Sequence, residues 1–313
     1  MILFIVNPVA GNGAGMLTVP GMEAAMKDSA AGFELVQTQR AGHATSIAAD
    51  AVKRGVEMVV AVGGDGTVHE VLNGILADRT IPSGATLAIV PAGSGNDLAR
   101  MLGIPTDVEA ACRLLEDHAI RRIDVGLATA LAGPQVAELP PGGRFFANML
   151  GIGFTAAVVV ESLAVGPLTG MERYAKAIER ALQARWVTPD VHLVIDGQSL
   201  SDRIAIQEIC NGQWEGGGFH VAPDASIDDG RFDIVTVAAM SQAELTEFIP
   251  RIATGDHLGH AAVSVIRARQ VAWESAEPVA IQADGEVLAE AATRMECLVL
   301  PGAVGVAVPH APG

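Results

Sequence analysis

Residues 58–67 read MVVAVGGDGT, an apolar run that passes directly into a glycine turn. The run is typical of a strand covered on both faces, and apolar side chains at helical spacing follow Thr67. Glycines at such a turn let backbone amides approach phosphate oxygens, and a helix N-terminus favours their negative charge. Asp65 can hold a Mg²⁺ ion that bridges phosphates. An ordinary connecting turn would explain one or two glycines, but not three together with an acid and a threonine.

Two further loops of similar composition follow neighbouring predicted strands. Residues 91–97 read PAGSGND after a strand expected at 86–90, and residues 7–13 read NPVAGNG after a strand expected at 1–6. Each loop alone resembles an ordinary turn, because asparagine, proline and glycine are common turn formers. Ligands of parallel α/β sheets bind at the carboxyl ends of the strands, so we predict that the three loops surround one ligand.

The order of the elements changes after the first third of the chain. The first part alternates strands with helices, which predicts a parallel sheet covered by helices. Its strands are expected at 1–6, 33–37, 58–62 and 86–90, and its helices at 16–31, 43–54, 68–76 and 107–115. The second part reads mostly as strands, at 120–128, 145–154, 191–195, 203–210, 231–237, 263–268, 279–282 and 297–300, which favours an antiparallel sheet sandwich. Two helices are expected to interrupt it, at 170–186 and 241–255, the second opening on a capping-box spacing.

Composition excludes several classes of partner and site. The net charge of −16 argues against nucleic acid, whose binding requires many lysines and arginines. Cys112, Cys210 and Cys297 are too far apart in sequence to suggest a disulfide framework or a zinc site, which fits a reducing cytoplasm. No apolar stretch reaches membrane-spanning length, so any membrane contact is expected to be transient and peripheral, at the inner membrane face. A homodimer is compatible with the sequence.

The motifs together resemble the diacylglycerol kinase catalytic family, which includes bacterial lipid kinases and sphingosine kinases. The resemblance is carried, in order along the chain, by Asn7-Pro8-x-x-Gly11, Thr38, Gly42-His43-Ala44, Gly63 to Thr67, Glu70, Asn73, Pro91 to Asp97, Asp228-Asp229-Gly230 and Asp284-Gly285-Glu286. It implies a phosphofructokinase-like α/β domain at 1–122 and an antiparallel β-sandwich that binds the acceptor at 123–300. A C-terminal tail at 301–313 is expected to return to the first domain, and the nucleotide is expected in the cleft between the domains.

The resemblance also implies cofactors and residue roles. ATP with Mg²⁺ would bind at Asn7, Pro8, Gly11, Thr38, Gly63, Gly64, Asp65, Gly66, Thr67, His69, Ser94 and Glu286. Asp65 would hold the magnesium ion of the nucleotide, Asp97 would belong to the polar network of the site, and Asp284 would be the general base. A second, structural magnesium ion would take the Asp229 carboxylate and the backbone carbonyls of Ser226 and Arg231, although an acidic surface turn is the alternative there.

The expected function is ATP-dependent phosphorylation of a lipid hydroxyl, with a diacylglycerol-like acceptor. Asp284-Gly285 taken alone favours a hairpin turn, and only the resemblance favours catalysis. Alternatives are an NAD or other small-alcohol kinase of the same superfold, and a non-catalytic nucleotide-binding protein. The sequence does not name the acceptor among lipid and soluble alcohols. Gly151-x-Gly153-x-x-Ala156 resembles a dinucleotide fingerprint but lies outside the alternating region, so we interpret it as strand-turn packing.

Overall fold

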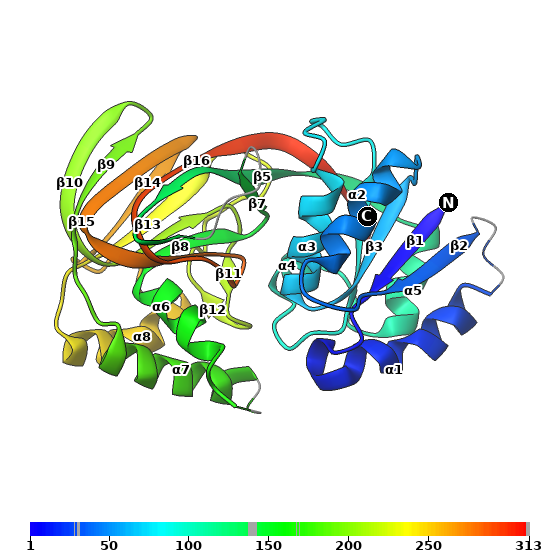
Figure 1. Ribbon diagram of the computed structural model, residues 1–313, viewed down its shortest axis with the longest axis horizontal. Helices are drawn as coiled ribbons and strands as arrows, with labels where there is room; N and C mark the ends of the chain where they lie inside the picture. The colour runs from blue at the N-terminus through cyan, green and yellow to red at the C-terminus, as the bar shows by residue number, and fades with distance from the viewer. Residues whose placement is uncertain (28, 30–31, 137–142, 167, 169, 311–313) are drawn as a thin grey trace. The chain divides into compact units, whose positions relative to one another are not determined.

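A computed structural model gives the fold and describes residues 1–27, 29, 32–136, 143–166, 168 and 170–310 (Figure 1). The chain forms two compact units. Unit 1 comprises Met1–Val125 together with Pro301–Gly313, and unit 2 comprises Gly126–Leu300. The last three residues of the expected tail, 311–313, lie outside the described residues.

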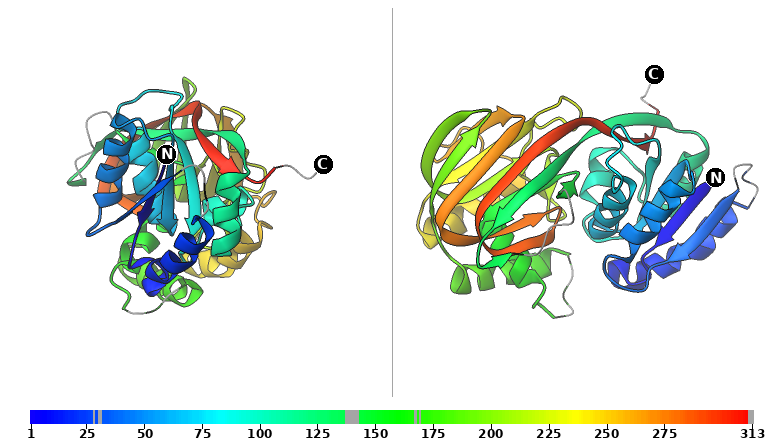
Figure 2. Two further views of the ribbon diagram at one scale, coloured as in Figure 1. Left: turned by 90° about the vertical axis from the view of Figure 1, so that its right-hand side faces the viewer. Right: turned by 45° about the horizontal axis from the view of Figure 1, so that its top comes forward.

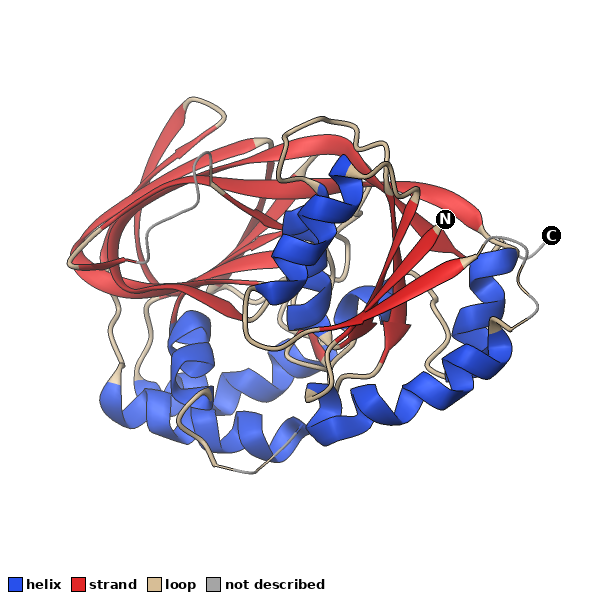
Figure 3. Cartoon of the chain, turned by 45° about the vertical axis from the view of Figure 1, so that its right-hand side comes forward, coloured by secondary structure: helices blue, strands red, loops and turns tan. Residues whose placement is uncertain are grey.

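Unit 1 is built on a parallel sheet with the strand order β2-β1-β3-β4. The strands are β1 Ile2–Val6, β2 Phe33–Gln37, β3 Met58–Gly63 and β4 Thr86–Pro91. All four strands predicted for this region are confirmed. Every residue of β1 and β3 is buried, because helices lie on both sides of this sheet (Figure 3).

The helices of unit 1 follow the strands in alternation. They are α1 Ala10–Ala25, α2 His43–Lys53, α3 Asp65–Ile75, α4 Asp97–Met101 and α5 Val108–Glu116. The helix predicted at 16–31 begins earlier and ends at Ala25, while residues 28, 30 and 31 lie outside the described residues. The backbone of Gly11, Asn12 and Gly13 is left-handed, so the regular part of α1 starts after them. The short α4 was not predicted, because five residues are too few for a visible helical pattern.

The last strand of the chain belongs to both units. β16, Glu286–Val308, begins in unit 2, and Gly305 and Val306 near its end pair in parallel with β4 of unit 1 (Figure 2). The backbone amide of Ser83 donates to the carbonyl oxygen of Ala303 at 2.8 Å, and that of Gly302 to the Asp124 carboxylate at 2.7 Å. The end of β16 therefore completes the sheet of unit 1.

Unit 2 is antiparallel, as the sequence predicts. β5, Ala119–Ala132, begins in unit 1 and enters unit 2 at Gly126. The other strands of unit 2 are β6 Gln135–Val136, β7 Arg144–Phe146, β8 Met149–Gly153, β9 Asp190–Ile195, β10 Gln198–Cys210, β11 Trp214–Glu215, β12 Phe219–His220, β13 Phe232–Ala238, β14 Val263–Ala268, β15 Gln270–Ala283 and the first part of β16. The two long strands β10 and β15 each pair with β9 through one half and with β8 through the other. This exchange closes the sheets around a core that contains Phe146, Phe232 and the fully buried Trp273.

Three helices cover one face of these strands: α6 Phe154–Ser162, α7 Gly170–Ala184 and α8 Gln242–Thr254. The capping box of α8, Ser241 with Glu244, is confirmed. The prediction was wrong at α6, because residue 154 had been assigned to a strand and no helix was expected after it. Residues 154–162 read FTAAVVVES and are mostly buried, so burial overrides their preference for strand. Within the described residues, no helix combines the length and the apolar character needed to cross a membrane.

Candidate functional site

Three loops at the carboxyl ends of β1, β3 and β4 meet at one edge of the unit 1 sheet. Asn7, after β1, donates from Nδ2 to Oγ1 of Thr67 in α3 at 3.0 Å. Gly11 approaches the loop after β4 so closely that a Cβ atom on it would lie 2.3 Å from the carbonyl oxygen of Ala92. The loops that the sequence predicts to surround one ligand are therefore in direct contact.

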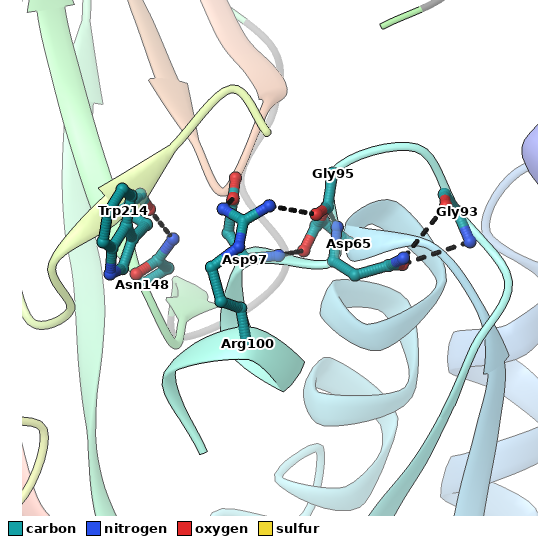
Figure 4. Close-up of polar contacts among 8 residues, drawn as sticks. Asp65, Gly93, Gly95, Asp97, Arg100, Asn148 and Trp214 are labelled. Carbon is teal, nitrogen blue, oxygen red and sulfur yellow. Dashed lines mark hydrogen bonds and ion pairs between the residues drawn. The ribbon is translucent and has the colours of Figure 1, made fainter. Parts of the chain in front are cut away.

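The Asp65 carboxylate ties the second loop to the third. Its Oδ2 accepts the backbone N–H of Asn96 and its Oδ1 that of Asp97, each at 2.8 Å (Figure 4). Gly64 and Gly93 are in contact beside these hydrogen bonds, and a Cβ atom on Gly93 would lie 2.3 Å from the Gly64 Cα atom. Glycine is therefore required at position 93 by the close approach of two backbones.

The loop after β4 is further held by its own side chains. Asn96 accepts the Gly93 N–H at 3.1 Å and donates to the Gly93 carbonyl oxygen at 2.9 Å. Asp97 is buried, and its Oδ1 accepts a hydrogen bond from Arg100 Nη1 at 2.8 Å, while Arg100 Nη2 donates to the Gly95 carbonyl oxygen at 3.2 Å (Figure 4). Ser94 at the tip is exposed. Asp97 thus belongs to a fixed polar network, and Ser94 is the accessible hydroxyl.

The start of α3 has the chemistry of an anion site. α3 begins at Asp65 directly after Gly63 and Gly64, and the first turn of a helix presents backbone N–H groups that have no partner within the helix. These groups and the helix dipole favour a phosphate. Asp65 adds carboxylate oxygens, the type of ligand that Mg²⁺ prefers.

The Asp284 carboxylate in unit 2, like that of Asp65, accepts backbone N–H groups from a segment far away in sequence. Asp284 and Gly285 form the two-residue turn between β15 and β16, with φ of 50° and 83°. The Asp284 carboxylate accepts backbone N–H groups from Ala147 and Asn148 at 2.8 Å each and from Met149 at 3.1 Å. The hairpin turn that the motif alone favours is therefore present, and it carries a carboxylate fixed by three donors. Glu286, which follows Gly285 and begins β16, is exposed.

Two family models match the chain. One is described as the diacylglycerol kinase catalytic domain and matches residues 1–128, and the other as the YegS C-terminal NAD kinase beta sandwich-like domain and matches residues 148–308. The chain belongs to the diacylglycerol kinase catalytic family. The resemblance predicted from the motifs is confirmed, as is the combination of an α/β part with a β-sandwich part.

Relatives match over most of the chain. A diacylglycerol kinase of Staphylococcus carnosus (strain TM300) is 30% identical over 290 residues, which cover 90% of this chain and 87% of the relative. One of Bacillus subtilis (strain 168) is 31% identical over 256 residues, which cover 80% and 77%. A solved structure from Bacillus anthracis str. Sterne, assigned as a diacylglycerol kinase, has a TM-score of 0.76 at 26% identity and covers 98% of this chain and 97% of its own. The named relatives make this a kinase family whose acceptor is an alcohol.

The remaining family motifs of unit 1 hold α2 and β2 near the loops. The Glu70 carboxylate accepts the backbone N–H groups of Gly42 at 2.7 Å and Ala44 at 3.0 Å, and so binds the N-terminus of α2. The Thr38 amide donates to the Val6 carbonyl oxygen at 2.8 Å, which places Thr38 beside the end of β1. His69, one turn after Asp65 in α3, is 2% exposed, so its side chain is buried in the interior.

The residues predicted to bind a structural Mg²⁺ ion form hydrogen bonds and an ion pair with other protein groups. Asp229 accepts the Arg231 N–H at 3.0 Å and forms an ion pair with Arg267, and Ser226 donates to Asp228 at 2.8 Å. A bound Mg²⁺ would compete with the Arg267 guanidinium for the Asp229 carboxylate. No group of three or more His, Cys, Asp or Glu residues suited to a metal occurs among the described residues. The Mg²⁺ site predicted here takes only one carboxylate together with two backbone carbonyls, so it remains a prediction.

A buried polar row in unit 2 was missed by the sequence analysis. Glu208 of β10, Gly151 of β8 and Gln282 of β15 are register partners on adjacent strands. Glu208 accepts a hydrogen bond from Thr155 in α6, and Gln282 donates one to Glu215 in β11. Burial, with a smaller contribution from Glu215, raises the pKa of Glu208 well above its ordinary value. The available signal was that polar residues interrupt two apolar stretches, IAIQEIC at 204–210 and VAIQA at 279–283.

Proposed function

We propose that the protein is an ATP- and magnesium-dependent kinase that transfers the γ-phosphoryl group to the hydroxyl of a lipid, with a diacylglycerol-like acceptor. The observation that carries the proposal is the junction of three glycine loops at the carboxyl ends of β1, β3 and β4, tied by the Asp65 carboxylate. Its relatives described as diacylglycerol kinases support the acceptor class.

The residues of unit 1 fit a nucleotide with magnesium. Backbone N–H groups at the start of α3 would bind phosphate oxygens, and Asp65 would hold the metal ion, which neutralises phosphate charge as it develops during transfer. Gly64, Gly93 and Gly11 keep the loops free of side chains where their backbones meet. The Arg100 ion pair keeps the Asp97 carboxylate in place beside them.

Asp284 would accept the proton of the acceptor hydroxyl. In the reaction, the hydroxyl oxygen forms a bond to the γ-phosphorus, the bond between that phosphorus and the bridging oxygen of ADP breaks, and the hydroxyl proton moves to the carboxylate. The three N–H donors from residues 147–149 fix the orientation of the carboxylate. Phosphoryl transfer depends chiefly on such positioning.

The decisive experiment measures ATP turnover by the purified protein with a panel of acceptors. The panel contains diacylglycerol, a sphingoid base and ceramide in mixed micelles, and NAD and glycerol as soluble alcohols. We expect magnesium-dependent turnover with diacylglycerol. Turnover with NAD alone would establish the small-alcohol alternative, and ATP binding without any turnover would establish a non-catalytic nucleotide-binding protein.

Asp284→Asn tests the role of the proposed base. Because the carboxylate faces the acceptor in the proposal, ATP affinity should remain within about twofold, whereas turnover should fall by about 100-fold or more, the scale for losing a positioned acid-base group. An ATP titration and a rate measurement on this variant decide the point. A loss of stability is expected in either case, because an N–H donor would face the asparagine NH₂ group. Weakened ATP binding together with retained turnover would mark Asp284 as a turn residue only.

A further inference from the structure

The Asp284 turn is attached to its surroundings through the side chain of Gln282. The Gly285 N–H, next to Asp284, donates to Oε1 of Gln282 at 2.8 Å. The Gln282 side chain is fully buried, so the amide is held at a fixed orientation with Oε1 toward the turn. Its Nε2 group then faces away from the turn and donates to the Glu215 carboxylate.

Glu215 belongs to a second hairpin, formed by β11 and β12 and spanning residues 214–220, which we call the glycine hairpin. Gly216, Gly217 and Gly218 at its tip all have positive φ, and the Phe219 ring packs against Tyr174 of α7. Asn148 connects the glycine hairpin to the same turn, because its backbone N–H donates to the Asp284 carboxylate. Its Nδ2 group donates to the Trp214 carbonyl oxygen (Figure 4). Two side-chain amides thus join the glycine hairpin to the Asp284 turn.

β8 lies between β10 and β15, and its residue Gly151 leaves space for the Gln282 amide. A Cβ atom on Gly151 would lie 2.7 Å from Gln282 Nε2 and 2.8 Å from Glu208 Oε2. Gly151 has an ordinary φ, so space and not backbone conformation requires glycine at this position. This accounts for the first glycine of the Gly151-x-Gly153 motif, which no nucleotide role explains.

The carboxyl groups near position 282 favour an uncharged hydrogen-bond donor there over a second carboxylate. Two carboxyl groups, Glu208 and Glu215, flank the Gln282 amide, and Glu208 is stabilised in its uncharged form by burial. The amide gives Glu215 a hydrogen-bond donor while its oxygen serves Gly285. A carboxylate at position 282 could accept from Gly285 but would repel Glu215.

We propose that Gln282 is a positioning residue, which couples the glycine hairpin to the turn and thereby sets the position of the Asp284 carboxylate against the acceptor. The inference rests on the function proposed above for Asp284. It assigns the glycine hairpin, which begins with Trp214, to the acceptor side of the reaction. Displacements of about 1 Å at a reacting group can lower rates by about 100-fold, so loss of the coupling should act on kcat.

A donor–acceptor exchange tests the coupling. Gln282→Glu should lower kcat by about 10-fold to 100-fold with the KM for ATP within about twofold, because two carboxylates then repel at the junction. The defect should become smaller as the pH falls and one of the two carboxyl groups takes up a proton. The double variant Gln282→Glu with Glu215→Gln restores one donor and one acceptor and should recover most of the lost kcat.

Gln207→Leu is the matched control. Gln207 is also a fully buried glutamine of the same sheet, and its Nε2 group donates to Thr236 Oγ1 at 3.1 Å, away from the Asp284 turn. This variant should lose stability while the kcat of the folded fraction stays unchanged. If Gln282→Glu behaves like this control, or if the double variant recovers no activity, the positioning role is overturned.

A readout that needs no turnover separates this inference from the proposed function. Hydrogen exchange at the Gly285 amide should be faster in Gln282→Leu than in the wild type and in Gln207→Leu. If the wild type shows no kinase turnover, the proposed function fails, and the exchange rates still decide whether Gln282 couples the hairpin to the turn. Equal Gly285 exchange in all three proteins would overturn the coupling.

Discussion

Asp65 in unit 1 and Asp284 in unit 2 both use a carboxylate to bind the backbone N–H groups of a segment far away in sequence. Asp65 joins two loops of a parallel sheet, at the start of a helix. Asp284 joins a hairpin turn to residues 147–149 of an antiparallel sheet. The first carboxylate therefore lies at a helix N-terminus, whose N–H groups attract phosphate, whereas the second lies in a turn between two strands, away from any helix N-terminus of its own hairpin.

The glycines beside the two carboxylates are required for different physical reasons. Gly93 is required by the approach of another backbone, since a Cβ atom would lie 2.3 Å from Gly64 Cα. Gly285 has open space around its Cβ position and is required by its φ of 83°. The loops of unit 1 are thus packed backbone against backbone, and the turn of unit 2 is a standard hairpin whose Asp284 side chain accepts three backbone N–H groups.

The largest effect is expected for Asp65→Asn. Removing the charge at the phosphates should lower ATP turnover by about 100-fold or more, the scale for one lost electrostatic group in a reacting site. One amide N–H would also face the NH₂ group of the asparagine, which should lower the free energy of unfolding by about 1–3 kcal/mol. A rate measurement gives the turnover, and denaturant unfolding gives the free energy of unfolding.

Asp284→Asn provides the comparison for this variant. Asp65→Asn should weaken ATP binding in the presence of magnesium, and Asp284→Asn should not. If both variants lose ATP affinity equally, the assignment of one carboxylate to the nucleotide and the other to the acceptor is wrong. Full turnover in Asp65→Asn would remove Asp65 from the site.

A buried carboxyl group without backbone donors should respond to pH in a different way from these two. Because the folded pKa of Glu208 is raised above its ordinary value of 4.5, the folded state keeps the proton while the unfolded state loses it. Above the unfolded pKa, this contribution to stability is lost at about 1.4 kcal/mol per pH unit until the folded pKa is reached. Glu208→Gln lacks this loss, so its stability relative to the wild type should rise with pH.

Denaturant unfolding of both proteins between pH 4 and 8 measures the difference. Glutamine keeps an oxygen that can accept from Thr155, so the local hydrogen bond is matched in the variant. Subtracting the two curves removes the contribution of the overall net charge. Parallel curves would show that Glu208 ionises equally in the folded and unfolded states.

The smallest effect is expected at Asp229, a surface carboxylate that accepts one backbone N–H and pairs with Arg267. Asp229→Ala should lower stability by about 1 kcal/mol, the usual value for one hydrogen bond. If a structural Mg²⁺ binds there, added magnesium should raise the Tm of the wild type more than that of the variant. Thermal melts with and without magnesium, in the absence of ATP, measure this. Equal responses would contradict the structural ion.

The sequence predicts unit 1 better than unit 2 for a physical reason. Its strands β1, β3 and β4 are mostly apolar runs, and the carboxyl ends of parallel strands must lie at one edge, so motif positions alone place Asp65 near residues 91–97. Antiparallel strands that are far apart in sequence have no such rule. The register that aligns Glu208, Gly151 and Gln282 depends on tertiary packing, and Thr155 lies in α6, a helix that the sequence does not predict.

The motif for Asp284 located the residue but not the groups around it. Its three N–H donors come from residues 147–149, which have backbone groups like any others and carry no signal in the sequence. Side-chain chemistry is therefore visible in sequence, and backbone donors are visible only in the fold.

Because β16 belongs to both units, the sheet of unit 1 can be completed only after residues 303–306 have been synthesised. These residues are buried beside β4, yet more than half of the chain separates them from that strand. During synthesis, the first 125 residues emerge with one sheet edge uncovered and must await the final segment. Contacts of such long sequence separation slow folding, and an uncovered β4 edge is a surface at which a chaperone or a second nascent chain can bind.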